Sequence, residues 1–321
     1  MASMVTVEAP ASSANLGAGF DVFALALARP KDRLTLEKAQ SGIKLSVHGE
    51  QLPTTPHSNV VEAVAKAIMA GERVREGVRL RLRKRVPIGA GLGSSAASSS
   101  ATVVGMNALF DLRLTNKKQI DYAGIGERFA SGTAHYDNVT AALFGGFVLV
   151  SKDKSFSRME PPHSLVLCLV IPRVKLPLQK TRYARSLLPR RLSIEEAVAA
   201  VSAASMMVHG LAVDSVEEFG AAMSGGFVDT RRSVMIPGFE RVKKAAVEHG
   251  AAGVCISGAG PAMLAATKGN KGRVILEAMT DAFEKESVKS DGFITKVGEG
   301  CRVIEQKGSV TLAGQVGRFP F

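Results

Sequence analysis

The sequence predicts an α+β protein of two domains, and three observations support this prediction. The chain has 321 residues, about twice the length of a typical domain. Segments of alternating apolar and polar residues, typical of half-buried strands, are interspersed with segments whose apolar residues recur at helical spacing. A polar stretch with two prolines, at 152–164, lies near the middle of the chain and is the best candidate for a domain junction.

The first half of the chain predicts both kinds of element. The strand patterns are short and bounded by glycine or proline, and we expect strands at 4–9 (ended by Pro10), 32–39, 42–49 and 77–86, and one after a turn within 142–150. The helical patterns are longer, and we expect helices at 59–71, from the glycine-rich stretch at 89–102 to about Leu109, and at 120–131.

The second half continues in the same way. An apolar run at 164–172 predicts a buried strand, 251–267 predicts two strands joined by a glycine turn, and 292–304 ends in a strand. Helices are expected at 193–213, 236–250 and 272–286. We therefore place the two domains at 1–160 and 161–304, and residues 305–321 form an unassigned tail.

Composition predicts a cytoplasmic globular protein. No apolar run approaches the roughly 20 residues of a membrane-spanning helix, and the N-terminus lacks the pattern of a secretory signal. The three cysteines, Cys168, Cys255 and Cys301, are far apart and form no CxxC pair, so neither a disulfide framework nor a zinc cluster is indicated. Because their neighbours are apolar, we expect them to be small buried side chains.

The net charge of +12 raises the question of an anionic partner. Basic residues are spread along the chain, aromatic residues make up 5%, and there is no tryptophan, so stacking platforms for single-stranded nucleic acid are scarce. Nucleic acid is therefore an improbable partner, whereas a small anionic ligand such as a nucleotide fits the same charge. The arginines of the 77–86 strand are expected on its solvated outer face.

The stretch GAGLGSSAASSSAT at 89–102 predicts a phosphate-binding loop. Glycines let the backbone approach an anion, and the first N–H groups of a helix have no internal partner and attract negative charge. Ser94 and Ser95 fall at the helix start, where hydroxyls cap N–H groups or reach a metal. The Walker A pattern is absent, and Pro87 argues against a Rossmann turn. A purely structural helix cap remains an alternative.

Two further small-residue turns make a structural cap less satisfactory. PASSANLGAGFD at 10–21 ends in an acid, and SGAGPAML at 257–264 lies between two apolar strands. One glycine turn is weak evidence for a ligand, but three of them in this order are much more specific.

These three motifs resemble those of the GHMP kinase superfamily, over positions 5 to about 304. Within it the first motif is similar to that of the homoserine kinase family, closest to the archaeal type. SGTAHYDNVTAALFGGF at 131–147 and TRYARSLLP at 181–189 resemble two further motifs of that family, with small departures at Tyr136 and at Thr140–Ala141.

The resemblance implies a fold and a reaction. The expected fold is a GHMP kinase fold, with an ATP-binding N-terminal domain similar to domain 2 of ribosomal protein S5 and a ferredoxin-like C-terminal domain. The expected activity is ATP-dependent, Mg²⁺-assisted phosphorylation of the L-homoserine side-chain hydroxyl to O-phospho-L-homoserine, in threonine biosynthesis. Both ligands would lie in the cleft between the domains, and a homodimer is possible.

The resemblance also assigns nucleotide and metal roles. The loop would wrap the triphosphate through Gly89, Gly91, Leu92, Gly93, Ser94 and Ser95. Ser95 and Glu127 would hold Mg²⁺, although Glu127 taken alone would be an ordinary surface acid. Asn59 would contact the adenine edge, or it is simply a helix N-cap.

The resemblance also assigns the residues that would bind the amino-acid substrate. Asp21 would bind the ammonium, a guanidinium fork from Arg185 and Arg232 would bind the carboxylate, and His135 would line the pocket. Nearby Arg182 and Arg231 are expected to be surface charges. Asn15 and Asn138 would orient the hydroxyl, with the phosphate accepting the proton, while Asp137 is structural or a weak base.

Three alternatives remain open from the sequence. The first is another kinase of the superfamily, acting on mevalonate, shikimate or pantoate, which lack the amine that Asp21 would bind. The second is an RNA-binding protein that uses the S5-like domain and the positive charge. The third is a sensor that binds ATP without turning it over.

Overall fold

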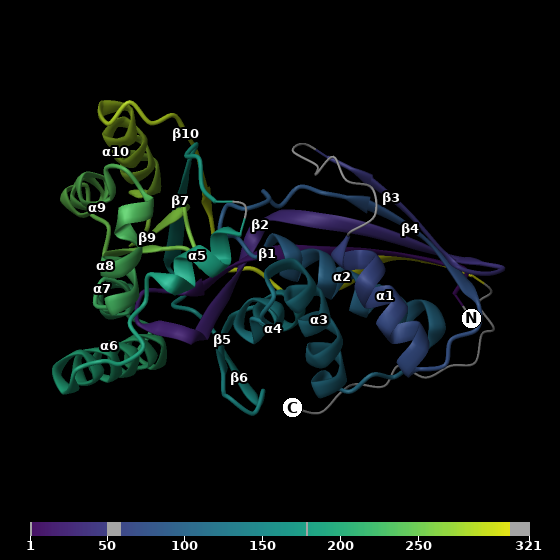
Figure 1. The fold of residues 1–321 in the computed structure, drawn as a ribbon. Helices are drawn as coiled ribbons and strands as arrows, with labels where there is room; N and C mark the ends of the chain where they lie inside the picture. Colours follow the sequence, from purple (N-terminus) through teal and green to yellow (C-terminus); the bar gives the residue numbers. More distant parts are fainter. Residues whose placement is uncertain (1, 50–58, 178, 309–321) are drawn as a thin grey trace.

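The computed structural model describes residues 2–49, 59–177 and 179–308, and it confirms the predicted α+β class. Two β-sheets lie side by side, each flanked by helices (Figure 1). Among the described residues, no helix is long and apolar enough to cross a membrane.

The first sheet is built mainly from the N-terminal half of the chain. It has seven strands: β1 (Met4–Asn15), β2 (Gly19–Ala39), β3 (Ile43–His48), β4 (Gly77–Arg83), β5 (Phe147–Val150), β6 (Phe156–Met159) and β11 (Arg302–Lys307). Its order is β11-β1-β2-β4-β3, with β5 paired to β2 and β6 to β5. β3 and β4 are parallel and the other named pairs in this sheet are antiparallel.

Helices cover one face of this sheet, and the opposite face is exposed along β4 (Figure 1). They are α1 (Val60–Gly71), α2 (Ser94–Phe110), α3 (Asn116–Ser131) and α4 (Tyr136–Phe144). β4 shows why the strand pattern alternates: Leu80 and Leu82 are buried under the helices, whereas Arg79 and Arg81 are exposed and pair with Glu37. The expected solvated basic face is therefore confirmed.

The second sheet has four antiparallel strands, in the order β10-β7-β9-β8. The strands are β7 (Leu165–Pro172), β8 (Gly253–Ile256), β9 (Met263–Lys268) and β10 (Ser290–Thr295). Helices between β7 and β8 are α5 (Lys180–Ser186), α6 (Ile194–Ala212), α7 (Val216–Met223), α8 (Phe227–Arg232) and α9 (Phe239–Glu248), and α10 (Gly272–Lys285) joins β9 to β10. This order is the one that the predicted ferredoxin-like arrangement requires.

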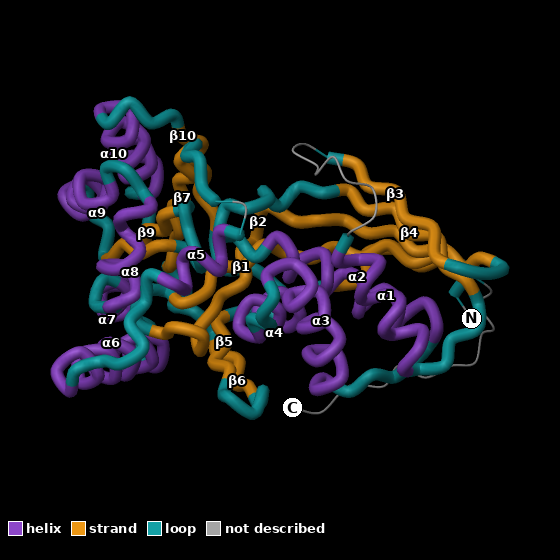
Figure 2. The backbone as a smooth tube through the Cα atoms, viewed as in Figure 1, coloured by secondary structure: helices purple, strands orange, loops and turns teal. Residues whose placement is uncertain are grey.

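Both faces of β7 are buried, which explains its uninterrupted apolar sequence. Leu167 and Leu169 belong to a core that continues into the first sheet, whereas Cys168 and Val170 pack in a second core with α9 and α10. Figure 2 shows the second sheet between its own helices and the first sheet. The first of these two cores is therefore shared by both halves of the protein.

The first two strands are much longer than predicted. β1 passes through Pro10, where a register shift between Pro10 and Ser12 accommodates the proline, and β2 begins at Gly19 instead of 32. Within the added parts, residues 11–15 of β1 and 23–27 of β2 are buried at consecutive positions, so they lack the alternation that marks a half-buried strand. Residues 142–144, expected in a turn, form the last part of α4.

The domain boundaries stay a prediction. β6 lies inside the expected junction at 152–164 and pairs with β5 of the first sheet. β11 spans the expected limit at 304 and also joins the first sheet, so residues 305–307 of the expected tail are in a strand, and 309–321 lie outside the described residues. The three cysteines are free thiols, and Cys168 and Cys255 are fully buried.

Candidate active site

A cleft of about 590 Å³ brings together every residue that the sequence assigned to the site. Its lining comes from the turn after β1, the loop before α2, the ends of α1 and α3, the start of α4, α5, α8 and the turn after β8. The predicted residues in this lining are Asn15, Asp21, Asn59, Gly89, Gly91, Leu92, Gly93, Ser94, Ser95, Glu127, His135, Asn138, Arg185 and Arg232.

The loop before α2 needs glycine at two positions. Gly91 and Gly93 have φ of +87° and +61°, a region that other residues rarely adopt. A Cβ on Gly91 would lie 2.4 Å from the Ser257 carbonyl oxygen, and one on Gly93 would lie 2.0 Å from Ser12 Oγ. The loop is therefore held tightly against the other two glycine turns. Gly93 is the N-cap of α2 and supplies no capping side chain, so the first N–H groups of the helix remain available to a ligand.

Lys84 forms hydrogen bonds with the first turn of α2, and sequence reasoning missed it. Its Nζ donates to Asp32 Oδ2 at 2.5 Å, to the Ser94 carbonyl oxygen at 2.6 Å and to Ser98 Oγ at 2.8 Å. Burial lowers the pKa of Lys84, while the charge of Asp32 opposes that shift. A signal was present: Lys84 continues the inward-facing positions Leu80 and Leu82, where a lysine is out of place unless it is paired.

Glu127 and Ser95 offer a donor set that suits Mg²⁺. Oε1 of Glu127 is buried without a hydrogen-bond partner, and its Oε2 lies 3.8 Å from His135 Nδ1. The Ser94 hydroxyl is already bound to the Val86 carbonyl oxygen, which leaves Ser95 as the hydroxyl at the helix start. In the described part of the chain, no cluster of three or more His, Cys, Asp or Glu could hold a metal. Such a sparse set fits Mg²⁺, which takes most of its ligands from phosphates and water.

The start of α4 carries a buried group of titratable side chains. Burial raises the pKa of Asp137 to about 6, although the nearby His135 opposes the shift. Burial lowers the pKa of His135, but Glu127 and Asp137 outweigh it and the net shift is upward. Asn138 Oδ1 accepts a hydrogen bond from Ser12 Oγ at 2.8 Å, and its Nδ2 donates to Asp137 Oδ1 at 3.4 Å. Ser12 is thus a second residue that sequence reasoning missed.

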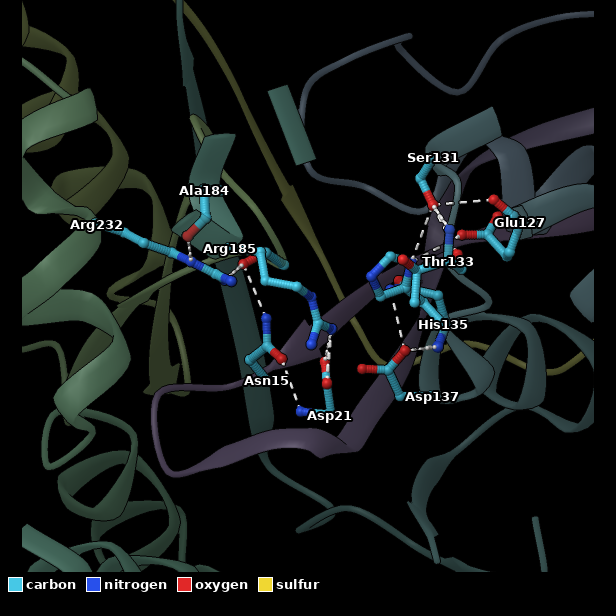
Figure 3. Close-up of polar contacts among 12 residues, drawn as sticks. Asn15, Asp21, Glu127, Ser131, Thr133, His135, Asp137, Ala184, Arg185 and Arg232 are labelled. Atoms are coloured by element: carbon cyan, nitrogen blue, oxygen red, sulfur yellow. Dashed lines mark hydrogen bonds and ion pairs between the residues drawn. The ribbon is translucent and has the colours of Figure 1, made fainter. Parts of the chain in front are cut away.

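Asp21 and Arg185 face each other across the other end of the cleft (Figure 3). Arg185 Nη2 donates to both carboxylate oxygens of Asp21, at 3.0 and 2.7 Å, and each side chain is about 40% exposed. Asn15, in the first motif, links that motif to the third. Its Nδ2 donates to the Gly258 carbonyl oxygen at 2.9 Å, and its Oδ1 accepts from the Asp21 N–H at 3.1 Å.

Arg232 lies behind this pair and is only 3% exposed. Its Nε donates to the Ala184 carbonyl oxygen and its Nη1 to the Gly258 carbonyl oxygen, at 3.1 and 2.9 Å. Burial lowers the pKa of Arg232 to about 10, so it remains a cation at neutral pH. The guanidiniums of Arg232 and Arg185 both lie 5.3 Å from the ring centre of Phe20.

The other predicted polar residues divide between the cleft and the surface. Asn59 accepts a hydrogen bond from the Val61 N–H at 2.9 Å and is the N-cap of α1, while also lining the cleft. Arg231 is on the surface and pairs with Glu196 at 3.0 Å. Arg182 is exposed, as expected, but it also contributes to the rim of the cleft.

Two family models match the chain, one in each half. The model of the GHMP kinases N terminal domain matches residues 59–146, and that of the GHMP kinases C terminal region matches residues 207–285.

Curated relatives and solved structures point the same way. Proteins named homoserine kinase from Haloquadratum walsbyi and Methanococcus maripaludis are 40% and 36% identical, over 93–94% of this chain and 98–99% of their own length. A crystal structure of homoserine kinase from Cytophaga hutchinsonii superposes with a TM-score of 0.86 at 33% identity, covering 95% of this chain and 98% of the other. Mevalonate kinase of L. major, at 14% identity and a TM-score of 0.66, shares the fold alone.

Proposed function

Because the chain belongs to the homoserine kinases of the GHMP kinase family, we propose that its cleft transfers the γ-phosphoryl group of ATP to the side-chain hydroxyl of L-homoserine. The chain is an ATP-dependent phosphotransferase, and its product, O-phospho-L-homoserine, lies on the route to threonine. The roles of individual residues below are inferred from the geometry of the cleft.

The nucleotide occupies the end of the cleft at the N-terminus of α2. The triphosphate lies on the backbone N–H groups of Gly89–Ser95, where the helix dipole adds a partial positive charge. Adenine lies near Asn59: with Oδ1 committed to the helix cap, Nδ2 is the atom left to donate to the base. Lys84 and Asp32 hold the helix start in place beneath the phosphates.

Mg²⁺ is held by Ser95 and Glu127 together with phosphate oxygens. The buried and unpartnered Oε1 of Glu127 supports this assignment, because a bound cation removes the cost of leaving it without a partner. When bound, the metal neutralises charge on the β- and γ-phosphates.

Homoserine occupies the end where Asp21 and Arg185 meet. A zwitterion offers an ammonium to Asp21 and a carboxylate to the arginines, so it replaces the ion pair that the two residues make in the free protein. Arg232 supplies a second guanidinium behind the first, already oriented by two carbonyl groups. His135 lines the pocket on the side of Glu127.

Transfer requires alignment more than a strong base. The homoserine oxygen forms a bond to the γ-phosphorus as the bond to the β–γ bridging oxygen breaks, and ADP leaves with that electron pair. Asn15 and Asn138 orient the hydroxyl, and its proton passes to an oxygen of the transferred phosphoryl group. We assign Asp137 a structural role, because it accepts hydrogen bonds from the Asn138 N–H at 2.6 Å and from Asn138 Nδ2 at 3.4 Å and so holds the Asn138 side chain in place.

One observation carries this proposal: an acid and two guanidiniums converge beside a glycine loop at a helix N-terminus. The test is ADP release with L-homoserine, L-serine, L-threonine and mevalonate as acceptors. We expect the highest kcat/KM with L-homoserine. Faster turnover of mevalonate, which lacks an amine, would contradict the assignment of Asp21, and ATP binding without ADP release would favour a sensor.

We also propose that the protein is cytoplasmic and forms a homodimer. Cell fractionation tests the first, and sedimentation at several protein concentrations tests the second.

A further inference from the structure

Lys180 is the first residue of α5, and its ammonium lies at the junction of two glycine turns. Its Nζ donates to the Gly89 carbonyl oxygen at 2.9 Å and to the Gly260 carbonyl oxygen. Gly89 belongs to the loop before α2, whereas Gly260 belongs to the turn between β8 and β9. One lysine therefore holds together, across the cleft, the two halves of the molecule.

The charge of Lys180 is poorly compensated where it lies. Among the described residues no carboxylate pairs with it, and its contacts are two neutral carbonyl groups. Burial and the nearby Arg232 lower the pKa of Lys180 to about 7. An anion bound next to Nζ would stabilise the protonated form of Lys180. The position therefore favours a negatively charged ligand, because no carboxylate of the described residues neutralises this ammonium.

The position of Lys180 indicates which part of a nucleotide would reach it. On one side lies the loop that we assign to the triphosphate, and on the other lies Arg232, assigned to the homoserine carboxylate. Arg185, on the same short helix, faces the Asp21 pocket. The group that must pass between these two half-sites during the reaction is the γ-phosphoryl group.

We propose that Lys180 is a further catalytic residue, which releases the two carbonyl groups when ATP binds and contacts the γ-phosphoryl group as it is transferred. This inference rests on the proposed function. Negative charge develops on the phosphoryl oxygens and on the β–γ bridging oxygen as that bond breaks, and a fixed ammonium stabilises it. Lys180 keeps its protons throughout, and the proton of the acceptor hydroxyl leaves with the phosphorylated product.

A merely structural lysine would tie the two turns together without sensing the γ-phosphate. The two roles differ in nucleotide binding, so we compare the dissociation constants of a non-hydrolysable ATP analogue and of ADP, both with Mg²⁺. Lys180→Gln keeps a donor for the carbonyl groups but removes the charge, Lys180→Met removes both, and Lys175→Met removes an exposed lysine of the same segment as a control.

We expect Lys180→Gln and Lys180→Met to weaken binding of the ATP analogue about 10- to 100-fold and that of ADP less than 3-fold. The kcat should fall at least 100-fold, and the Lys175→Met protein should behave as wild type. Equal loss of affinity for both nucleotides, or an unchanged preference for the analogue over ADP, would overturn the inference. If instead the wild-type protein binds nucleotide but fails to phosphorylate L-homoserine, the proposed function itself is wrong.

Discussion

Arg232 and Arg231 are adjacent in the sequence but differ in every physical respect that matters for binding an amino acid. Arg232 is buried, is oriented by the Ala184 and Gly258 carbonyl groups and lines the cleft, whereas Arg231 is exposed and pairs with Glu196. A buried guanidinium held in place loses little freedom when it binds a carboxylate, so its contact is worth more than that of a surface arginine.

We therefore predict that Arg232→Ala raises the KM for L-homoserine about 10- to 100-fold, because one charge-assisted contact is lost. The KM for ATP should change less than 3-fold. Steady-state titration of each substrate measures both, and Arg231→Ala is the matched control, expected to resemble wild type. Equal effects of Arg232→Ala on the two substrates would contradict its assignment.

Substitutions at Glu127 and Ser95 should change the Mg²⁺ requirement and leave the KM for L-homoserine nearly unchanged. We predict that Glu127→Gln and Ser95→Ala shift the Mg²⁺ dependence of turnover to at least about 10-fold higher concentration, because each removes one metal ligand. The KM for L-homoserine should stay within a few-fold of wild type. Magnesium titration at saturating homoserine gives the comparison, and an unchanged Mg²⁺ requirement in both variants would exclude these ligands.

Asp229 is a buried acid that the reaction does not use. Its Oδ2 accepts a hydrogen bond from the Ile256 N–H at 2.9 Å, its Oδ1 is buried without a partner, and burial raises its pKa to about 7. Between its ordinary pKa, near 4, and about 7, the folded protein holds a proton that the unfolded chain has lost. The free energy of unfolding therefore falls as pH rises through this window.

We predict that Asp229→Asn removes this loss, since the amide oxygen can still accept from Ile256. As pH rises from 5 to 8, the variant should gain free energy of unfolding relative to wild type, by about 3 kcal/mol at most, because a pKa of about 7 lies about two pH units above the start of this range. Urea unfolding at both pH values tests this, with the exposed Asp281→Asn as control. A constant difference between Asp229→Asn and wild type would show that Asp229 is not protonated in the folded state.

At the scale of elements, local patterns predicted the longer helices well, missed the short helices α4, α5, α7 and α8, and predicted the first two strands poorly. α2, α6 and α10 begin and end close to the expected residues, since glycine turns, a capping serine and helical spacing all act locally. The lengths of β1 and β2 depend on helices and strands that bury them from both sides, which no local alternation reveals.

Asn59 shows how one residue can serve an element and a ligand together. Its Oδ1 caps α1, whereas its Nδ2 is the atom proposed for adenine. We predict that Asn59→Asp preserves thermal stability, because the capping oxygen remains, but raises the KM for ATP several-fold. Asn59→Ala should lose both functions, at about 1 kcal/mol in stability. An unchanged KM for ATP in the Asn59→Asp protein would show that Asn59 caps α1 and does not contact adenine.

At the scale of the whole molecule, the sequence predicted that the candidate residues meet in one cleft, but it did not predict the side chains that hold them there. Three glycine motifs, far apart in sequence, meet in one cleft as the resemblance implied. Lys84, Ser12 and Lys180 were missed because their partners are brought to them by the packing of the two sheets. Lys84 alone left a signal, as a charged residue at an inward-facing strand position.

The central claim is that a triphosphate and a zwitterion share this cleft, and a crystal structure with a non-hydrolysable ATP analogue, Mg²⁺ and L-homoserine tests it most directly. We expect the phosphates at the N-terminus of α2, the ammonium group of homoserine within hydrogen-bond distance of Asp21, and its carboxylate on Arg185 and Arg232. Phosphates bound away from that helix, or an Asp21–Arg185 ion pair left intact with homoserine bound elsewhere, would contradict the account.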